Sequence, residues 1–233
     1  MVISVFQQLV LLVVTSFVAI ELAKQGHKVT LSDISSSELE LAEDHAKSEN
    51  VLLEKIVQAD ARDLGSFFSA KEEYDVVLLL GPLYHLLEES ERIRTLEDCI
   101  SITKLGGFII CSFVTKFAHL RDLVSKDPRR LKREKKFYEE YIVTGRYTRN
   151  QAILSHHTHP AEIQHLFGKV ARHGLEVRRT VGCEGFLGGS LSKHLIGLNE
   201  EEYKTWVDII MDTAEDPHIL SASDHIAVVA QKV

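Results

Sequence analysis

The sequence has few cysteines and no excess of positive charge. The first argues against disulfide-rich and zinc-binding proteins, and the second against nucleic-acid-binding proteins. Its 233 residues include three cysteines, which lie far apart and form no C-x-x-C pair. A disulfide framework and a structural zinc site are therefore not expected, and a reducing compartment is favoured. Lysine and arginine number 27 against 34 acidic residues, for a net charge of −7. This balance disfavours a nucleic-acid-binding protein, because such proteins depend on clustered positive charge.

The first twenty residues lack charge altogether, so a membrane or secretory role has to be weighed. A secretory signal begins with basic residues and ends at a small-residue cleavage site, and neither is present. A membrane-spanning helix needs ~20 predominantly apolar residues, and polar side chains interrupt this stretch at Ser4, Gln7, Gln8, Thr15 and Ser16. We therefore expect a soluble, cytoplasmic protein that does not act at a membrane, with Leu9 to Leu12 as a buried central strand.

What the sequence does contain is enough apolar material for one well-packed domain over residues 1–233, since 45% of it is hydrophobic and 26% charged. Apolar periodicity and glycine stops predict alternating strands and helices. The predicted helices are 17–26, 35–48, a segment around 93–100, 160–173 and 199–215. The predicted strands are 27–33, 54–60, 75–81, 108–113, 175–182 and 225–231. Such alternation predicts an α/β, Rossmann-like, doubly wound and mostly parallel sheet.

The rhythm of strands and helices breaks between residues 114 and 165. This segment shows no convincing strand and has too few apolar positions for a core of its own. We interpret it as a helical lid inserted over the strand ends, with Tyr138, Tyr141 and Tyr147 as aromatic walls. Its basic block at 129–136 is read as a solvated helix face. On the late helix, the spacing of Tyr203, Trp206 and Ile210 is typical of core residues.

Candidate ligand-binding residues stand at the ends of the predicted strands. In an open α/β sheet, ligands bind outside the carboxyl ends of the strands. Asp33 ends one strand, where a carboxylate can accept both hydroxyls of a ribose, and Asp60 ends the next, where it can accept from an adenine amino group. Gly81-Pro82 ends a third, where the backbone can pass close to a ligand. Each residue alone also fits a capping or turn role, but together they favour a nucleotide-like cofactor.

Several stretches resemble the class I S-adenosylmethionine-dependent methyltransferases, in a branch that acts on small molecules. They are AIELAKQGHKVTLSDIS, QADARDL, the run from YDVVLLLGPLYHL to GGFIICSF, HTHPAEIQHLF, GCEGFL and SASDHIAVVAQ. The resemblance covers residues 17–233. It implies a seven-stranded sheet with an antiparallel last strand and S-adenosylmethionine as cofactor. Asp33 then holds the ribose, Asp60 and Ala61 the adenine, and Leu80 and Gly81 the amino-acid end. Ile34 and Pro82 complete the implied cofactor-binding residues.

The sequence departs from that family where a glycine-rich turn should connect the first strand and helix. Residues 11–17 read LVVTSFV, and no glycine precedes Gly26. The turn requires positive φ and a bare backbone against the cofactor, which Val13, Val14 and Thr15 do not provide. We therefore expect impaired cofactor binding. A degenerate paralogue and an altered amino terminus, from a different exon or gene model, both fit this departure.

Histidines and their neighbours supply the candidates for catalysis and substrate binding. His85 and His157 are predicted as catalytic, because a histidine with a pKa near neutrality can act as a general base. Tyr84, His159 and Glu184 are predicted to line the substrate pocket. The spacing of the histidines near Pro160 fits no standard zinc pattern, so no metal is expected.

The sequence thus favours methyl transfer from S-adenosylmethionine to an oxygen or nitrogen atom of a small molecule. Two alternatives stay open. One is a non-catalytic, degenerate member of the fold that serves as a binding or partner protein, which the missing glycine turn favours. The other is an NAD(P)-dependent oxidoreductase, since an acid at the end of the second strand also suits a nicotinamide cofactor. Neither the substrate nor the oligomeric state can be read from the residues.

Overall fold

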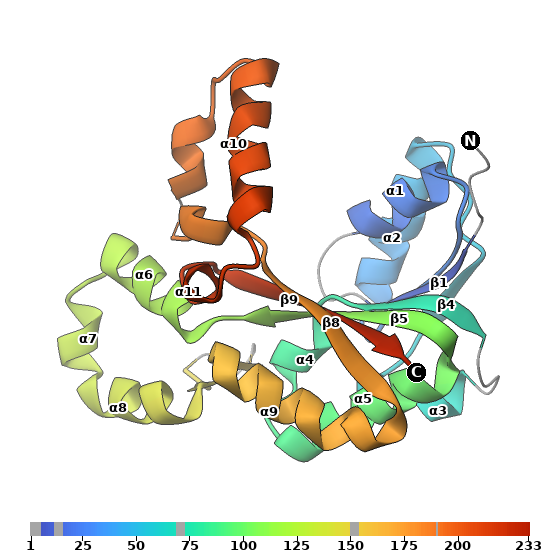
Figure 1. The fold of residues 1–233 in the computed structure, drawn as a ribbon, viewed down its shortest axis with the longest axis horizontal. Helices are drawn as coiled ribbons and strands as arrows, with labels where there is room; N and C mark the ends of the chain where they lie inside the picture. The colour runs from blue at the N-terminus through green and yellow to red at the C-terminus, as the bar shows by residue number, and fades with distance from the viewer. Residues whose placement is uncertain (1–5, 12–15, 69–72, 150–153, 190) are drawn as a thin grey trace.

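The computed structural model describes residues 6–11, 16–68, 73–149, 154–189 and 191–233 (Figure 1). Strands of the main sheet are β1 (Gln7–Leu11), β2 (Lys28–Asp33), β3 (Lys55–Gln58), β4 (Tyr74–Leu79), β5 (Thr103–Val114), β8 (Leu175–Gly182) and β9 (His225–Lys232). Helices beside it are α1 (Phe17–Lys24), α2 (Ser36–Ser48), α3 (Leu64–Phe67), α4 (Pro82–His85), α5 (Glu89–Ile102), α9 (Pro160–Val170), α10 (Glu200–Thr213) and α11 (Pro217–Leu220). The segment after β5 contains α6 (Lys116–Lys126), α7 (Arg130–Arg133), α8 (Lys135–Thr144) and the short strands β6 (Arg146–Tyr147) and β7 (Ser155–His156).

The strands of the main sheet follow the order β3-β2-β1-β4-β5-β9-β8. Neighbours from β3 to β5 pair in parallel, whereas β9 runs antiparallel to both β5 and β8. The predicted α/β Rossmann-like fold is confirmed, and the sheet is mixed because of β9. The predicted first strand occupies a central position between β2 and β4. Leu12 lies outside the described residues, so the predicted burial of Leu9 to Leu12 is not described.

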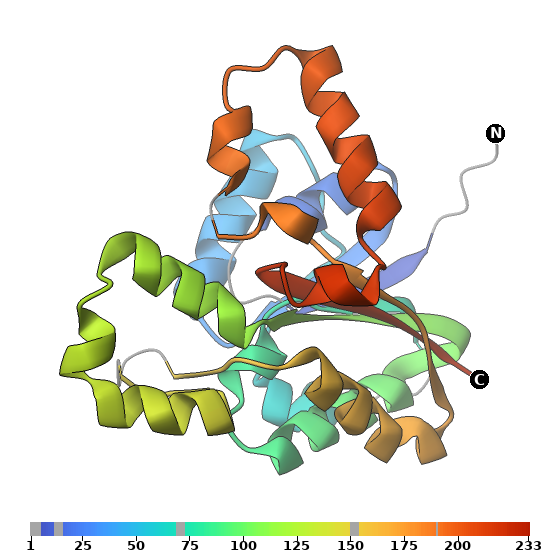
Figure 2. The same cartoon turned by 60° about the vertical axis from the view of Figure 1, so that its left-hand side comes forward.

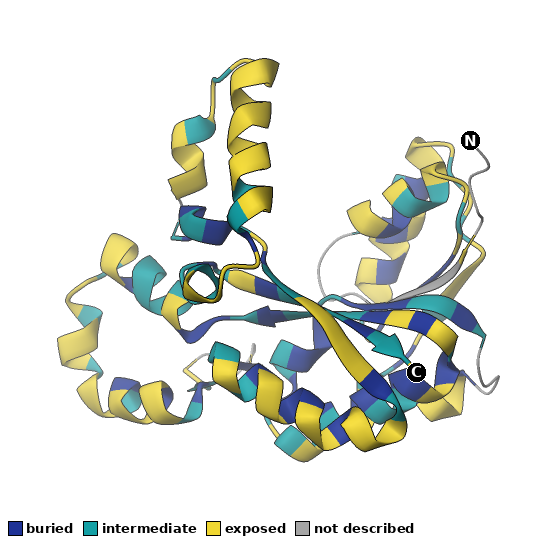
Figure 3. Cartoon of the chain, in the orientation of Figure 1, coloured by how far each residue is buried: buried dark blue, intermediate teal, exposed yellow. Residues whose placement is uncertain are grey.

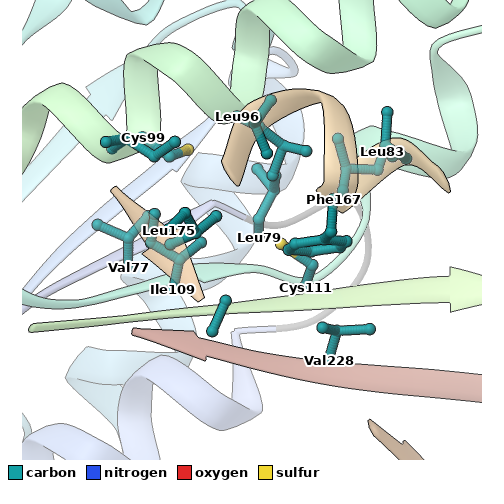
Figure 4. Close-up of a cluster of buried hydrophobic side chains, with 14 of the residues drawn as sticks. Val77, Leu79, Leu83, Leu96, Cys99, Ile109, Cys111, Phe167, Leu175 and Val228 are labelled. Atoms are coloured by element: carbon teal, nitrogen blue, oxygen red, sulfur yellow. The ribbon is translucent and has the colours of Figure 1, made fainter. Parts of the chain in front are cut away.

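Helices cover both faces of the sheet, and each face has its own apolar core. On one face, Ala19 of α1 and Leu39 and Ala42 of α2 pack on the sheet around Leu31 of β2. On the other face lie α3, α4, α5 and α9, where a larger cluster is built on β4, β5 and β9 (Figure 4). Members of this cluster include Val77, Leu79, Leu96, Cys99, Ile109, Cys111, Phe167 and Val228. The sheet is therefore held between two apolar layers, and its strand ends meet at one edge.

Local sequence signals explain where the first elements begin and end. Ser35 accepts a hydrogen bond from the backbone N–H of Glu38 at 3.3 Å, which caps the amino end of α2. Gly26, with φ of 87°, reverses the chain after α1 so that β2 can start. The connection from β1 to α1 falls where the sequence places the missing glycine turn. Residues 12–15 of that turn lie outside the described part of the chain.

The segment 114–165 differs from its predicted description. Leu123, Tyr138 and Tyr141 are buried together, with Leu120, Phe137 and Tyr147 packed against them. This small aromatic core arises because α6 and α8 fold against each other, so the prediction that the segment lacks a core was wrong. Tyr138 and Tyr141 are 2% and 0% exposed, and they therefore do not form the wall of an open pocket. Figure 2 shows how the three helices stand beside the sheet.

The late helix α10 also differs from its prediction. Its apolar residues were expected to be core, but Tyr203 and Trp206 are 53% and 41% exposed. The helix stands away from the sheet, and its surface is almost entirely exposed (Figure 3). Amphipathic spacing predicts a helix with an apolar face, but it does not determine what covers that face. Among the described helices, none is both long and apolar enough to span a membrane.

Candidate functional site

The carboxyl ends of the parallel strands bring most of the predicted residues to one edge of the sheet. Asp33, the last residue of β2, is 6% exposed. Its Oδ1 accepts a hydrogen bond from the backbone N–H of Ser35 at 2.7 Å. Burial raises the pKa of Asp33, and no cation lies within 4.0 Å of its carboxylate among the described residues. The side chain therefore keeps acceptor capacity for a ligand.

The residue after Asp33 and the turn after β3 complete one end of this edge. Ile34 is apolar yet 57% exposed. Asp60 caps a short 3-10 helix that begins at Ala61, and both its oxygens accept from Nε of Arg62, at 3.0 and 2.9 Å. The hydrogen bond from Arg62 lowers the pKa of Asp60. Arg62 was not anticipated, and it occupies part of the carboxylate that the sequence assigns to an adenine amino group.

The segment after β4 forms the middle of the edge. Leu80 and Gly81 follow the strand, and Pro82 is the first residue of α4. The Tyr84 hydroxyl donates to the backbone oxygen of Leu80 at 3.4 Å, and burial raises the pKa of Tyr84. This hydrogen bond holds α4 against the end of β4, at the same edge of the sheet as Asp33.

His85 lies between that edge and the segment before β7. Its Nδ1 is 3.0 Å from the backbone oxygen of Leu154, which can only accept, so Nδ1 carries the hydrogen. The charge of His85 acts on both Asp33 and His157. The structure thus brings His85 close to the predicted cofactor and substrate residues, with Nε2 unpaired in the described part of the chain.

His157 is the centre of a buried hydrogen-bond network. Its Nδ1 lies 2.7 Å from the Tyr141 hydroxyl and its Nε2 lies 3.0 Å from the Ser155 hydroxyl. Tyr141 also donates to the backbone oxygen of Lys116 at 3.0 Å. Burial lowers the pKa of His157 to about 3. The ring is therefore neutral at physiological pH, and both of its nitrogens already have partners.

His159 and a neighbouring cavity lie on the lid side of the edge. Nδ1 of His159 accepts from the backbone N–H of Ala161 and so caps α9, while its ring lies edge-on to Phe117. A cavity of about 490 Å³ opens between α5, α8 and α9, lined in part by Arg92 and Glu162. Arg92 is buried and donates to two backbone oxygens after α4. These bonds hold the turn that follows His85.

Glu184 accepts four hydrogen bonds, shared between its two carboxylate oxygens. Its Oε2 accepts from the Ser223 hydroxyl and from the backbone N–H groups of Asp224 and His225, at 2.7 to 3.0 Å. Its Oε1 accepts from Nδ1 of His225 at 2.6 Å. Burial acts to raise the pKa of Glu184, but these hydrogen bonds outweigh it and bring the pKa to about 2. Glu184 is therefore ionised at any physiological pH.

His225 is a candidate that the sequence reasoning missed. The sequence places it at the start of the last strand, but its partner Glu184 is 41 residues away and reaches it only because β8 and β9 pair. The signal that could have found it is an acid in the turn after one strand and a histidine at the start of its neighbour. Among the described residues, histidine, cysteine, aspartate and glutamate form no group of three that could hold a metal ion.

Comparisons with known proteins agree on one kind of domain. Residues 13–107 match a family described as a methyltransferase domain. A SAM-dependent methyltransferase from Methanosarcina mazei superposes with a TM-score of 0.63 at 18% identity, covering 100% of this chain and 94% of its own. One from Mesorhizobium loti gives 0.61 at 12% identity, covering 97% and 91%. Magnesium protoporphyrin IX methyltransferase from Synechocystis, solved with bound SAM, gives 0.53 at 14% identity, covering 98% and 71%. No curated protein matches the chain.

Proposed function

We propose that the chain is a class I S-adenosylmethionine-dependent methyltransferase, with S-adenosylmethionine as cofactor, and that it methylates an oxygen or nitrogen atom of a small molecule. The match of residues 13–107 to a methyltransferase domain supports the proposal. The observation that carries the proposal is the buried Asp33 carboxylate, which ends β2 without a cation partner in the described structure. A buried, unpaired carboxylate costs the fold free energy, and a ligand that donates two hydrogen bonds to it removes that cost.

The described residues fit the adenosyl half of the cofactor. Asp33 would accept the ribose hydroxyls, and the exposed Ile34 beside it would cover an adenine face. Asp60 and Ala61 would meet the adenine edge, with Arg62 holding the Asp60 carboxylate in place. Leu80, Gly81 and Pro82 would approach the amino-acid end along the backbone after β4.

The cofactor supplies an activated methyl group, so the protein's tasks are to orient the acceptor, exclude water and remove a proton where needed. The lid of residues 114–165 supports the second task, because its helices stand beside the strand ends around a core of their own. Tyr84, His159 and Glu184 are the proposed substrate-side residues. Of the histidines proposed as catalytic, His85 keeps Nε2 unpaired in the described chain, and His157 fixes Tyr141 and Ser155.

A calorimetric titration with S-adenosylhomocysteine tests the proposal, on the unaltered chain and on a variant with an acid- and glycine-rich turn grafted over residues 11–16. We expect weak binding by the unaltered chain, reduced by roughly thirty- to a thousandfold relative to the graft if two close contacts are missing. Tight binding by the unaltered chain would show that the turn is not where the sequence places it. Binding by neither chain would contradict the proposal.

The second candidate is a non-catalytic member of the fold that acts as a binding or partner protein. It is favoured by one observation, the absence of any glycine before Gly26. Binding of S-adenosylhomocysteine by neither chain would support this candidate. A nicotinamide-dependent oxidoreductase receives no support, since the family match is to a methyltransferase domain.

A further inference from the structure

We propose that His225, oriented by Glu184, accepts the proton of the methyl acceptor, which is then an oxygen or nitrogen atom that carries hydrogen. The inference rests on the proposed function and adds to it the group that receives the proton. The acceptor's lone pair bonds to the methyl carbon, the electron pair of the broken carbon–sulfur bond stays on sulfur, and the proton passes to Nε2 of His225.

The geometry of the pair fixes which nitrogen is free. An ionised carboxylate can only accept hydrogen bonds, so Nδ1 of His225 carries the hydrogen that is shared with Oε1 of Glu184 at 2.6 Å. The lone pair of the neutral ring is then on Nε2, which has no partner among the described residues. A carboxylate behind a histidine holds its ring orientation and tautomer, as general bases require.

The position of His225 places it at the same edge of the sheet as the proposed site. Because β9 is antiparallel, its first residue lies at the edge where the parallel strands end, paired with Val114 of β5. Ile226 and Val228 belong to the core on the α5 and α9 face, so alternation puts His225 on the opposite face. By the same alternation Asp33 shares the face of Leu31, which packs against α1 and α2. Both residues therefore point to one side of one edge.

The exposure of His225 also suits a proton acceptor. Its side chain is 46% exposed, whereas that of Glu184 is 30% exposed and tied to the turn before β9. Glu184 raises the pKa of His225 by their hydrogen bond. The other charged groups around the ring are Asp224, which Arg121 of α6 binds at 2.6 Å, and His157, whose pKa the charge of His225 helps to lower. Glu184 is thus a positioning residue for His225.

The first test is an NMR titration of the histidine rings in the whole chain, with His225→Gln to assign the signal. We expect the neutral ring to carry its hydrogen on Nδ1 and to titrate above the ordinary histidine pKa. That elevation should vanish in Glu184→Gln and return in part in Glu184→Asp, which keeps the charge. His218, exposed on α11, is the matched control. A hydrogen on Nε2, or a titration that is the same in wild type and Glu184→Gln, would overturn the proposal.

The second test uses 4-nitrophenol as a probe acceptor, because its visible spectrum reports whether it has lost its proton. With S-adenosylhomocysteine present, we expect bound probe to show at least tenfold more phenolate at pH 6 than free probe, and His225→Gln to abolish the excess. An equal excess in both chains, or none in the wild type, overturns the role of His225. S-adenosylhomocysteine should also shift the His225 signal and not that of His218. If calorimetry detects no binding to either the unaltered or the grafted chain, the proposed function fails first, and the role of His225 with it.

Discussion

A buried carboxylate destabilises a fold, and Asp33 is such a carboxylate. Its pKa is raised by burial, so in the interval just above the ordinary value of 3.8 the folded chain binds more protons than the unfolded one. Stability therefore falls as pH rises through that interval, and the loss persists at neutral pH. The residue therefore lowers stability at neutral pH, while its carboxylate is the one proposed to hold the ribose.

The substitution Asp33→Asn separates these two effects. We expect a higher urea midpoint at pH 7.5, because a neutral amide is cheaper to bury. We also expect affinity for S-adenosylhomocysteine to fall by roughly 10- to 100-fold, since hydrogen bonds to a charged group are lost. Asp44→Asn, on the exposed side of α2, should change neither quantity. Unchanged affinity in Asp33→Asn would remove Asp33 from the ligand site.

The pKa of His157 is shifted in the opposite direction, so His157 is expected to make the chain less stable in acid. Its pKa of about 3 in the folded chain lies below the ordinary value of 6.5, so its contribution is fully present above pH 6.5 and is lost as pH falls toward 3. The slope should approach roughly 1.4 kcal/mol per pH unit within that window. Urea denaturation between pH 6.5 and 4.5 should therefore show a clear decline, above the range where Glu162 and Glu184 protonate.

The substitution His157→Gln should flatten that decline and cost about 1–3 kcal/mol at pH 8, because Tyr141 and Ser155 lose their buried partner. His218→Gln is the control and should leave the slope as it is. If the slope is the same in His157→Gln and wild type, other groups are responsible for the acid sensitivity.

At the scale of elements, replacing two helix glycines by alanine is expected to change stability in opposite directions. Gly145 ends α8 with φ of 70°, and a Cβ there would collide with the backbone oxygen of His157. Gly145→Ala should cost about 2–4 kcal/mol in urea denaturation, from the left-handed backbone and the collision together. Gly168, inside α9, has open space around it. Gly168→Ala should stabilise the chain by about 0.5–1 kcal/mol. Equal effects of the two substitutions would mean that backbone geometry does not distinguish the two positions.

The helix α10 tests whether amphipathic spacing implies burial in this chain. Trp206 is 41% exposed and meets Phe186 at a ring distance of 6.3 Å. Trp206→Ser should therefore cost less than about 1 kcal/mol, well short of the 3–5 expected of a core tryptophan. Leu166→Ala, in the buried stripe of α9, is the comparison and should cost about 2–5 kcal/mol. A large cost for Trp206→Ser would show that α10 packs against something in solution.

At the scale of the whole molecule, the sequence alone predicts those parts of the fold that local signals determine. Glycine stops, the cap at Ser35 and the apolar run of β4 are local, and they led to the correct alternation and to the edge where Asp33, Asp60 and Gly81 lie. The fold follows from these signals because parallel strands and right-handed crossovers leave few other arrangements.

The remaining features depend on contacts between distant segments. The aromatic core of the lid forms only when α6 and α8 meet, and Glu184 reaches His225 only through the pairing of β8 with β9. Arg62, which binds Asp60, could not be assigned because a residue two positions away can point anywhere. The same limit explains α10, whose periodicity gives the helix but not its partner.

The place of β9 has a consequence for how the chain is made. This strand follows both of its neighbours in the chain, yet it lies inside the sheet, between β5 and β8. While the ribosome is still adding residues 225–232, β5 and β8 each present an edge of unpaired backbone groups, and such edges invite pairing with other chains. The nascent protein is thus vulnerable to aggregation until β9 has been added to the sheet. A stop codon that removes even the last nine residues should leave an insoluble product, although nearly all of the predicted ligand-binding edge would have been translated.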